Sequence, residues 1–142
     1  MNLLLSKKLG KCLNEKGAIV YYTRDADYDL AKTNNNRKRN DLYARVKLIN
    51  HSNANLYISM HLNASPSKKW NGIQIFYSSL KKENSYYMYS KLKVPGVLIE
   101  AGFISNPNDN YKIRQEEYQN ILVNNIAKGI ENYFNTLGES DQ

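Results

Sequence analysis

The sequence has one cysteine, two histidines and no long apolar run, and each shortage excludes a class of protein. Cys12 is the only cysteine in 142 residues, which excludes an internal disulfide and a cysteine-rich zinc site. No stretch approaches the roughly 18 to 20 apolar residues of a membrane span. The opening MNLLLSKKLG lacks the apolar core of a signal peptide. We therefore expect neither a membrane span nor an export signal in the sequence as written.

Motifs of nucleophilic catalysis are missing as well. The chain contains no Gly-x-Ser-x-Gly turn and no glycine-rich phosphate loop. Cys12 falls in a helical apolar pattern, where a cysteine usually serves for packing. The candidates for chemistry are therefore histidines and carboxylates.

What the chain does contain indicates a folded domain with a basic surface. Hydrophobic residues make up 42% and charged residues 23% of the sequence, which is ordinary for a globular protein. The formal charge of +7 and the pI near 9.4 favour an anionic partner such as nucleic acid, a membrane surface or an acidic wall polymer. Beyond the basic run Arg37 to Arg39, no nucleic-acid reading motif accompanies the charge, so we expect no nucleic-acid partner.

Hydrophobic periodicity predicts alternating helices and strands. An amphipathic helix over residues 2–16 ends at Gly17, and a second helix begins at Asn40 or Asp41 and ends near Ile49. A terminal helix covers residues 115–135. The predicted strands cover residues 18–22, 56–61, 73–79, 86–90 and 94–103.

This alternation predicts an α/β fold with a mainly parallel sheet that is flanked by helices on both faces. We expect one domain over residues 1–136 and a flexible tail over residues 137–142. Ligands of such folds bind where the strands end at their carboxyl edge. His61 ends the predicted strand over residues 56–61, and Glu100 directly follows the apolar run Val97, Leu98 and Ile99 of the strand over residues 94–103. We therefore expect both residues in one crevice at the carboxyl edge of the sheet.

Alternatives exist for each of these residues. His61 could simply form a local hydrogen bond at the end of its strand, and Glu100 could pair with Arg24, which also ends a strand. The second histidine, His51, is a poor metal partner for His61, because the extended chain between them spans about 17 Å at ~3.3 Å per residue. We therefore expect His51 to be a surface loop residue.

Five segments together resemble a known family. In chain order, the signatures of the zinc-dependent N-acetylmuramoyl-L-alanine amidases are similar to VYYTRDAD, the element Leu42 to Arg45, ANLYISMHLNAS, NGIQIFYS and VPGVLIEAGFISNPND. The spore-cortex, CwlD-like branch shows the nearest similarity. The resemblance implies a phosphorylase/hydrolase-like fold and a hydrolase of the cell envelope that cleaves peptidoglycan at the amide between N-acetylmuramic acid and L-alanine. For this branch it also implies a role in sporulation and germination.

The resemblance also assigns roles to single residues. His61 falls on the last of three Zn²⁺ ligands, and Glu100 falls on the catalytic base that takes a proton from the attacking water. Asn63 matches an asparagine that shapes the loop or contacts substrate. Anionic wall polymers are the partner that best fits the basic surface.

Two departures from the family pattern qualify these expectations. The segment that carries the first two zinc ligands of the family is absent, so only one of the three ligands remains. We therefore expect weak zinc binding, unless Glu100, Asp25 or a second subunit supplies a donor. Only LKKENS joins residues 73–79 to 86–90, which is too short for a parallel crossover. The fold should therefore be incomplete and the chain prone to self-association. A non-catalytic remnant or envelope-binding domain is the alternative to an active amidase.

Overall fold

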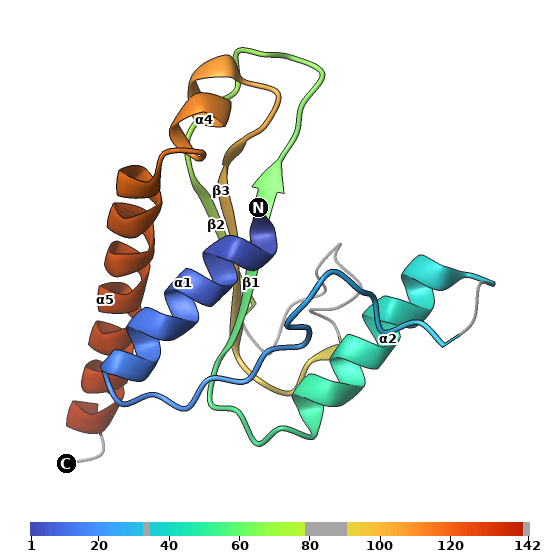
Figure 1. Cartoon of the computed structure of the whole chain (residues 1–142). Helices are drawn as coiled ribbons and strands as arrows, with labels where there is room; N and C mark the ends of the chain where they lie inside the picture. The colour runs from blue at the N-terminus through green and yellow to red at the C-terminus, as the bar shows by residue number, and fades with distance from the viewer. Residues whose placement is uncertain (33–34, 79–90, 141–142) are drawn as a thin grey trace. The chain divides into compact units, whose positions relative to one another are not determined.

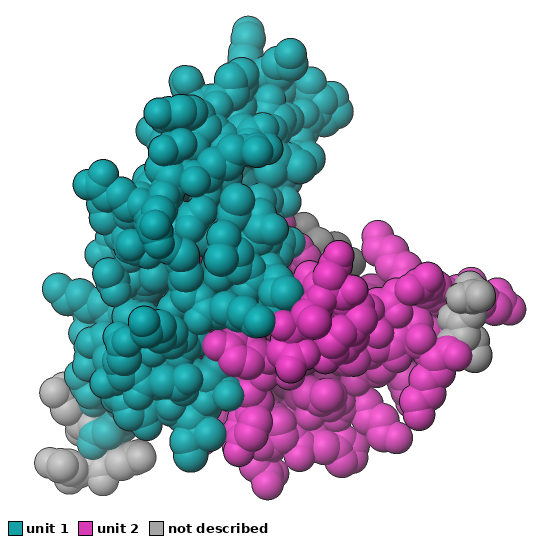
Figure 2. Space-filling model, viewed as in Figure 1, with its two compact units in different colours: residues 1–20, 62–73, 101–142 teal, residues 21–61, 74–100 magenta. Residues whose placement is uncertain are grey.

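The computed structural model describes residues 1–32, 35–78 and 91–140. They divide into two compact units, coloured in Figure 2. Unit 1 comprises residues 1–20, 62–73 and 101–142, and unit 2 comprises residues 21–61 and 74–100. In chain order the elements in Figure 1 are α1 (Asn2–Glu15), α2 (Arg37–Asn50), β1 (Tyr57–Asn63), β2 (Gln74–Ser78), β3 (Gly96–Phe103), α4 (Pro107–Lys112) and α5 (Glu116–Ser140).

The sheet has the strand order β1-β3-β2, with β3 between its neighbours. β2 is antiparallel to β3, and Gln74 lies opposite Glu100. β1 is parallel to β3, because the Tyr57 amide donates to Pro95 O at 2.9 Å and the Ile104 amide donates to Asn63 O at 2.8 Å. The predicted α/β class is confirmed, with a mixed sheet over the described strands.

Unit 1 contains the helix pair α1 and α5, which lie side by side in Figure 1. Leu5, Leu9 and Leu13 are the buried leucines of α1, at the helical spacing that predicted this element. Ion pairs also join the two helices: Lys8 contacts Glu116 at 3.1 Å and Lys16 contacts Glu131 at 2.8 Å. The predicted helix over residues 2–16 is confirmed, and the backbone just past it turns at Gly17 with φ of 85°.

Unit 2 contains α2 and a small core cluster. Val46 and Ile49 of α2 are buried together with Leu92, and Tyr57 and Val94 pack against them. The helix begins at Arg37 after Asn36, so the predicted start at Asn40 or Asp41 is wrong. Asp41 does not cap the helix because its carboxylate accepts hydrogen bonds from Arg45 and from the Leu30 amide.

Other differences from the prediction have local causes. Residues 18–22 do not form a strand; the described sheet places no partner strand beside them, and Ile19 is 82% exposed. α5 continues to Ser140, so four residues of the predicted tail are helical. Among the residues with described structure, no helix is both long and apolar enough to cross a membrane. The predicted strand over residues 86–90 lies outside the described residues.

Candidate active site

Glu100 is a carboxylate on the central strand β3 of the sheet. Its Oε2 atom is buried, and among the described residues it has no hydrogen-bond partner. Burial raises the pKa of Glu100, and the nearby His61 charge partly opposes this by lowering it. A buried carboxylate oxygen without a partner costs free energy. Such an oxygen is typical of a group that acts on a proton rather than one that stabilises the fold.

His61 lies near the end of β1, the strand beside β3. Its side chain is exposed, and its charge acts on Glu100. The two residues are close enough for the charge of His61 to act on Glu100. Their expected place at strand ends is wrong, because β1 continues past His61 to Asn63 and β3 continues past Glu100 to Phe103. The alternative pairing of Glu100 with Arg24 is wrong, because Arg24 Nη1 donates to Ala26 O at 3.1 Å and to Asp27 Oδ1 at 3.4 Å.

Asn63 is the last residue of β1, and its polar atoms shape the following turn. Its Oδ1 accepts from the Ala64 amide at 2.8 Å, and its carbonyl oxygen accepts from the Ile104 amide at 2.8 Å. The loop-shaping role that the resemblance implied therefore has a physical basis. Contact with substrate stays a prediction.

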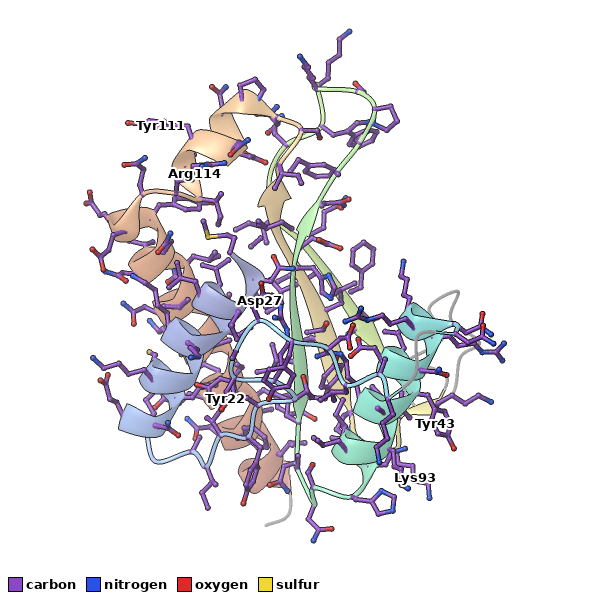
Figure 3. All side chains as sticks on the ribbon, turned by 45° about the vertical axis from the view of Figure 1, so that its right-hand side comes forward. Tyr22, Asp27, Tyr43, Lys93, Tyr111 and Arg114 are labelled. Atoms are coloured by element: carbon purple, nitrogen blue, oxygen red, sulfur yellow. The ribbon has the colours of Figure 1, made fainter. Side chains whose placement is uncertain are left out.

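His51 lies directly after α2, where it is exposed. Its Nδ1 atom is 2.7 Å from Lys47 O. The residue lines a hollow of about 350 Å³ in unit 2, together with Tyr43, Val46, Lys47, Asn50 and Lys93; Figure 3 labels Tyr43 and Lys93. The location fits the predicted surface residue, and it places two lysines at one concave surface.

A metal at His61 requires more donors than the described residues provide. No group of three or more His, Cys, Asp or Glu side chains within residues 1–32, 35–78 and 91–140 could hold a metal ion. A catalytic zinc site uses three protein ligands and keeps one position open. Asp25 is engaged elsewhere, accepting from the Tyr28 hydroxyl at 2.9 Å. The described residues therefore do not fit a complete zinc centre.

Two polar residues near the end of β3 were missed by the sequence analysis. Asn106 is only 7% exposed and caps α4 by accepting from the Asn108 and Asp109 amides. Asp109 Oδ2 accepts from the Phe103 amide at 3.0 Å and from the Gly72 amide at 2.8 Å. An asparagine followed by proline is a recognisable helix start. The contact with Gly72 has no such signal, because the two residues are distant in sequence.

Comparison with known protein families shows which family the chain belongs to. Residues 1–87 and 79–132 match the family model described as N-acetylmuramoyl-L-alanine amidase. The chain belongs to the N-acetylmuramoyl-L-alanine amidase family. The resemblance inferred from the five segments is thereby confirmed. The amidase match comes in two overlapping parts, and their overlap, residues 79–87, includes the short LKKENS connection.

Two proteins similar to the chain have amidase names, and the first agrees with the spore-cortex, CwlD-like branch. The chain is 40% identical to the germination-specific N-acetylmuramoyl-L-alanine amidase of Bacillus subtilis, over 89% of this chain and 66% of the relative. It is 25% identical to the probable cell wall amidase LytH of Staphylococcus epidermidis, over 94% of this chain and 49% of the relative. The chain thus spans just under two thirds of the first relative and about half of the second.

Solved amidase structures share the fold. The CwlD amidase from Clostridioides difficile, solved in complex with the GerS lipoprotein, has a TM-score of 0.87 at 28% identity, covering 94% of this chain and 84% of that one. An N-acetylmuramoyl-L-alanine amidase from Clostridium difficile 630 has a TM-score of 0.80 at 26% identity, covering 94% of this chain and 81% of that one.

Proposed function

We propose that this amidase-family chain hydrolyses the amide between N-acetylmuramic acid and L-alanine in peptidoglycan. The observation that carries the proposal is Glu100 Oε2, which is buried without a partner while the neighbouring strand brings His61 near it. Glu100 takes a proton from the attacking water and delivers it to the leaving nitrogen as the carbon–nitrogen bond breaks. The products are the lactyl carboxylate and the free L-alanine amine.

His61 is proposed as one ligand of the zinc ion that this family uses, and Asn63 as the residue that shapes the adjoining loop and contacts substrate. Because a zinc site needs three ligands, the remaining donors have to come from outside the described residues or from a second subunit. The proposed proton transfer itself depends on Glu100.

Release of muropeptides from purified sacculi tests the proposal. We expect Glu100→Gln to abolish release, because the amide cannot accept the water proton. Glu117→Gln, on the exposed start of α5, is the matched control and should leave release unchanged. Equal release by both variants would exclude Glu100 as the base.

A second candidate is a non-catalytic domain that binds the cell envelope. The incomplete metal ligand set among the described residues favours it. In that case the chain sediments with sacculi and releases nothing, and Glu100→Gln does not change the bound fraction. The sedimentation and release assays on the same sample therefore separate the two candidates.

Anionic wall polymers and a lipoprotein are the partners that we propose in addition to peptidoglycan, at an extracytoplasmic location. Lys47 and Lys93 at the hollow of unit 2 offer two cations, and no described residue forms an ion pair with either. The lipoprotein is proposed from the CwlD complex alone. If wall polymers bind at the hollow, Lys47→Gln with Lys93→Gln should weaken binding to polymer-bearing sacculi and leave binding to stripped sacculi unchanged.

A further inference from the structure

The loop between β1 and β2 carries the only tryptophan of the chain, Trp70, and exposes it. This loop, residues 64–73, belongs to unit 1. Trp70 is 59% exposed, although tryptophan is usually well buried. Single exposed apolar side chains are common, so exposure alone indicates nothing. What distinguishes Trp70 is how firmly its loop is held.

Three side chains from the segment after β3 hold the loop at its beginning, middle and end. Ser105 Oγ accepts from the Ser65 amide at 3.0 Å, and Asn106 Nδ2 donates to Lys68 O at 2.7 Å. Asp109 Oδ2 accepts from the Gly72 amide at 2.8 Å. The last two bonds lie on either side of Trp70, so the backbone that carries the indole is fixed on both sides.

The residues that hold the loop are themselves fixed. Asn106 is buried and uses its other polar atom to cap α4. Asp109 Oδ2 also accepts from the Phe103 amide, and an ionised acceptor makes a stronger hydrogen bond than a neutral one. Gly102, next to Phe103, has φ of 140°, and a Cβ there would lie 3.4 Å from Asp109 Oδ2. The amides of Phe103 and Gly72 therefore hold the same oxygen of this carboxylate.

The loop also has order of its own. Ser65 Oγ accepts from the Ser67 amide at 3.2 Å, Ser67 Oγ accepts from the Lys69 amide at 3.3 Å, and Asn71 Nδ2 donates to Lys69 O at 3.0 Å. Lys68 and Lys69, beside Trp70, are exposed, and neither pairs with an acid of the described chain. A loop that is ordered before binding loses little conformational entropy on binding.

We infer that Trp70 is an aromatic platform on which a sugar ring of the peptidoglycan glycan strand stacks, and that Asn106 and Asp109 are its positioning residues. An indole offers a large rigid apolar face, which suits the C–H face of a pyranose ring. The two adjacent lysines suit the carboxylates that this polymer carries. The inference rests on the proposed function for the identity of the polymer, and it adds the residue that holds the sugar.

Fluorescence of the single tryptophan tests the inference directly. Peptide-free oligosaccharides of alternating N-acetylglucosamine and N-acetylmuramic acid are titrated into the full chain, with a free stem peptide as comparison. We expect the oligosaccharide to shift the emission to the blue and to protect Trp70 from acrylamide quenching with a saturating dose response. We expect the stem peptide to do neither. Unchanged quenching at saturating oligosaccharide would overturn the inference.

This measurement requires neither turnover nor bound metal, so its failure is distinct from failure of the proposed hydrolysis. Muropeptide release without protection of Trp70 would leave the amidase proposal standing and remove the platform. Protection of Trp70 without release would support the platform and count against hydrolysis by this chain.

Variants locate the effect on Trp70. Measured by calorimetry, Trp70→Ala should bind the oligosaccharide about tenfold more weakly, and Trp70→Tyr should stay within about threefold of the parent, because a tyrosine ring also stacks. Tyr111→Ala is the matched control: Tyr111 is 68% exposed on α4 of the same unit and is labelled in Figure 3. Equal losses for Trp70→Ala and Tyr111→Ala would refute a specific platform.

The positioning role has its own readout. Asn106→Ala should raise the acrylamide quenching of unliganded Trp70 and weaken oligosaccharide binding, whereas adding Asn106→Ala to Trp70→Ala should cause no further loss. Ser105→Ala removes a single hydroxyl and serves as the milder variant if Asn106→Ala does not fold. Additive losses in the double variant would show that Asn106 does not act through Trp70.

Discussion

The charged contact between Asp41 and Arg45 in unit 2 allows a quantitative test. Asp41 Oδ2 accepts from Arg45 Nε at 2.8 Å, and Oδ1 accepts from Arg45 Nη2 at 3.0 Å and from the Leu30 amide at 2.8 Å. Arg45 Nη1 in turn donates to Thr23 Oγ1 at 2.8 Å. Both side chains of the ion pair are only 17% exposed. This cluster ties the loop that follows residue 20 to α2.

Substituting Asp41 by alanine leaves the Arg45 guanidinium and the Leu30 amide without their acceptor. A buried donor left unsatisfied costs ~1–3 kcal/mol, and breaking a fully buried ion pair costs ~3–5 kcal/mol. Because Asp41 and Arg45 are partly exposed, we expect a loss of about 2–3 kcal/mol in the free energy of unfolding at pH 7. Asp41→Asn keeps one acceptor oxygen and should lose less, about 1–2 kcal/mol.

The pH dependence of this loss follows from the pKa of Asp41. Burial alone would raise it, but the hydrogen bonds from Arg45 and the Leu30 amide outweigh burial and lower the pKa. A carboxylate with a lowered folded-state pKa stabilises the protein above its unfolded-state pKa, which is about 3.9. That stabilisation disappears as the pH falls through the folded-state pKa. The cost of Asp41→Asn should therefore be full at pH 7 and shrink below about pH 4.

Urea unfolding of the parent and variant chains between pH 3 and pH 7 measures these losses. Asp27→Asn is the control, since Asp27 pairs with Arg24 at 3.4 Å from a fully exposed position, and we expect no measurable change there. A loss for Asp41→Asn below about 0.5 kcal/mol, or one that stays constant with pH, would refute the reasoning.

Further predictions concern stability, metal binding and assembly. Glu100→Gln should leave the unfolding midpoint unchanged or raise it, because a neutral amide costs less to bury without a partner than an ionised carboxylate does. Glu117→Gln is the control, and a clear drop for Glu100→Gln would contradict this expectation. The chain alone should retain much less than one equivalent of zinc after dialysis, and stoichiometric zinc measured by mass spectrometry would overturn the expectation. β1 lies at one edge of the described sheet, so light scattering should show association that grows with concentration, and a clean monomer would count against it. Gly102→Ala should destabilise the chain by about 1–3 kcal/mol, because φ at Gly102 is 140°. Gly129→Ala within α5 should instead stabilise it by about 0.5–1 kcal/mol. Changes of the same sign in the free energy of unfolding, measured with urea, would refute the distinction.

Hydrophobic pattern along the sequence was enough to predict the helices and strands that bury their apolar residues. The leucines of α1 recur at helical spacing, and β3 is a near-continuous apolar run that is buried. Residues 18–22 carry the same kind of apolar signal, yet they do not form a strand. A strand depends on a neighbour for its hydrogen bonds, and no local pattern can supply that information. The exposed Ile19 shows the consequence.

The candidate site was predictable to the same extent. His61 and Glu100 could be placed together because each ends an apolar run, and strand ends of a parallel pair meet at one edge. The loop of Trp70 could not be predicted, because its three hydrogen bonds come from residues about 40 positions away along the chain. Those bonds join segments that follow the paired ends of β1 and β3, where the Ile104 amide donates to Asn63 O.

The segment after β3 contacts both the end of this strand and the end of the Trp70 loop. Asp109 accepts from the Phe103 amide at the end of β3 and from the Gly72 amide at the end of the Trp70 loop. One carboxylate therefore joins the end of β3 to the end of the Trp70 loop. A variant that weakens this carboxylate, such as Asp109→Asn, should raise the mobility of Trp70 and lower the stability of β3 together, whereas Trp70→Ala should leave the stability of β3 unchanged. The loop and the end of β3 thus form one structural element, although about thirty residues separate them in sequence.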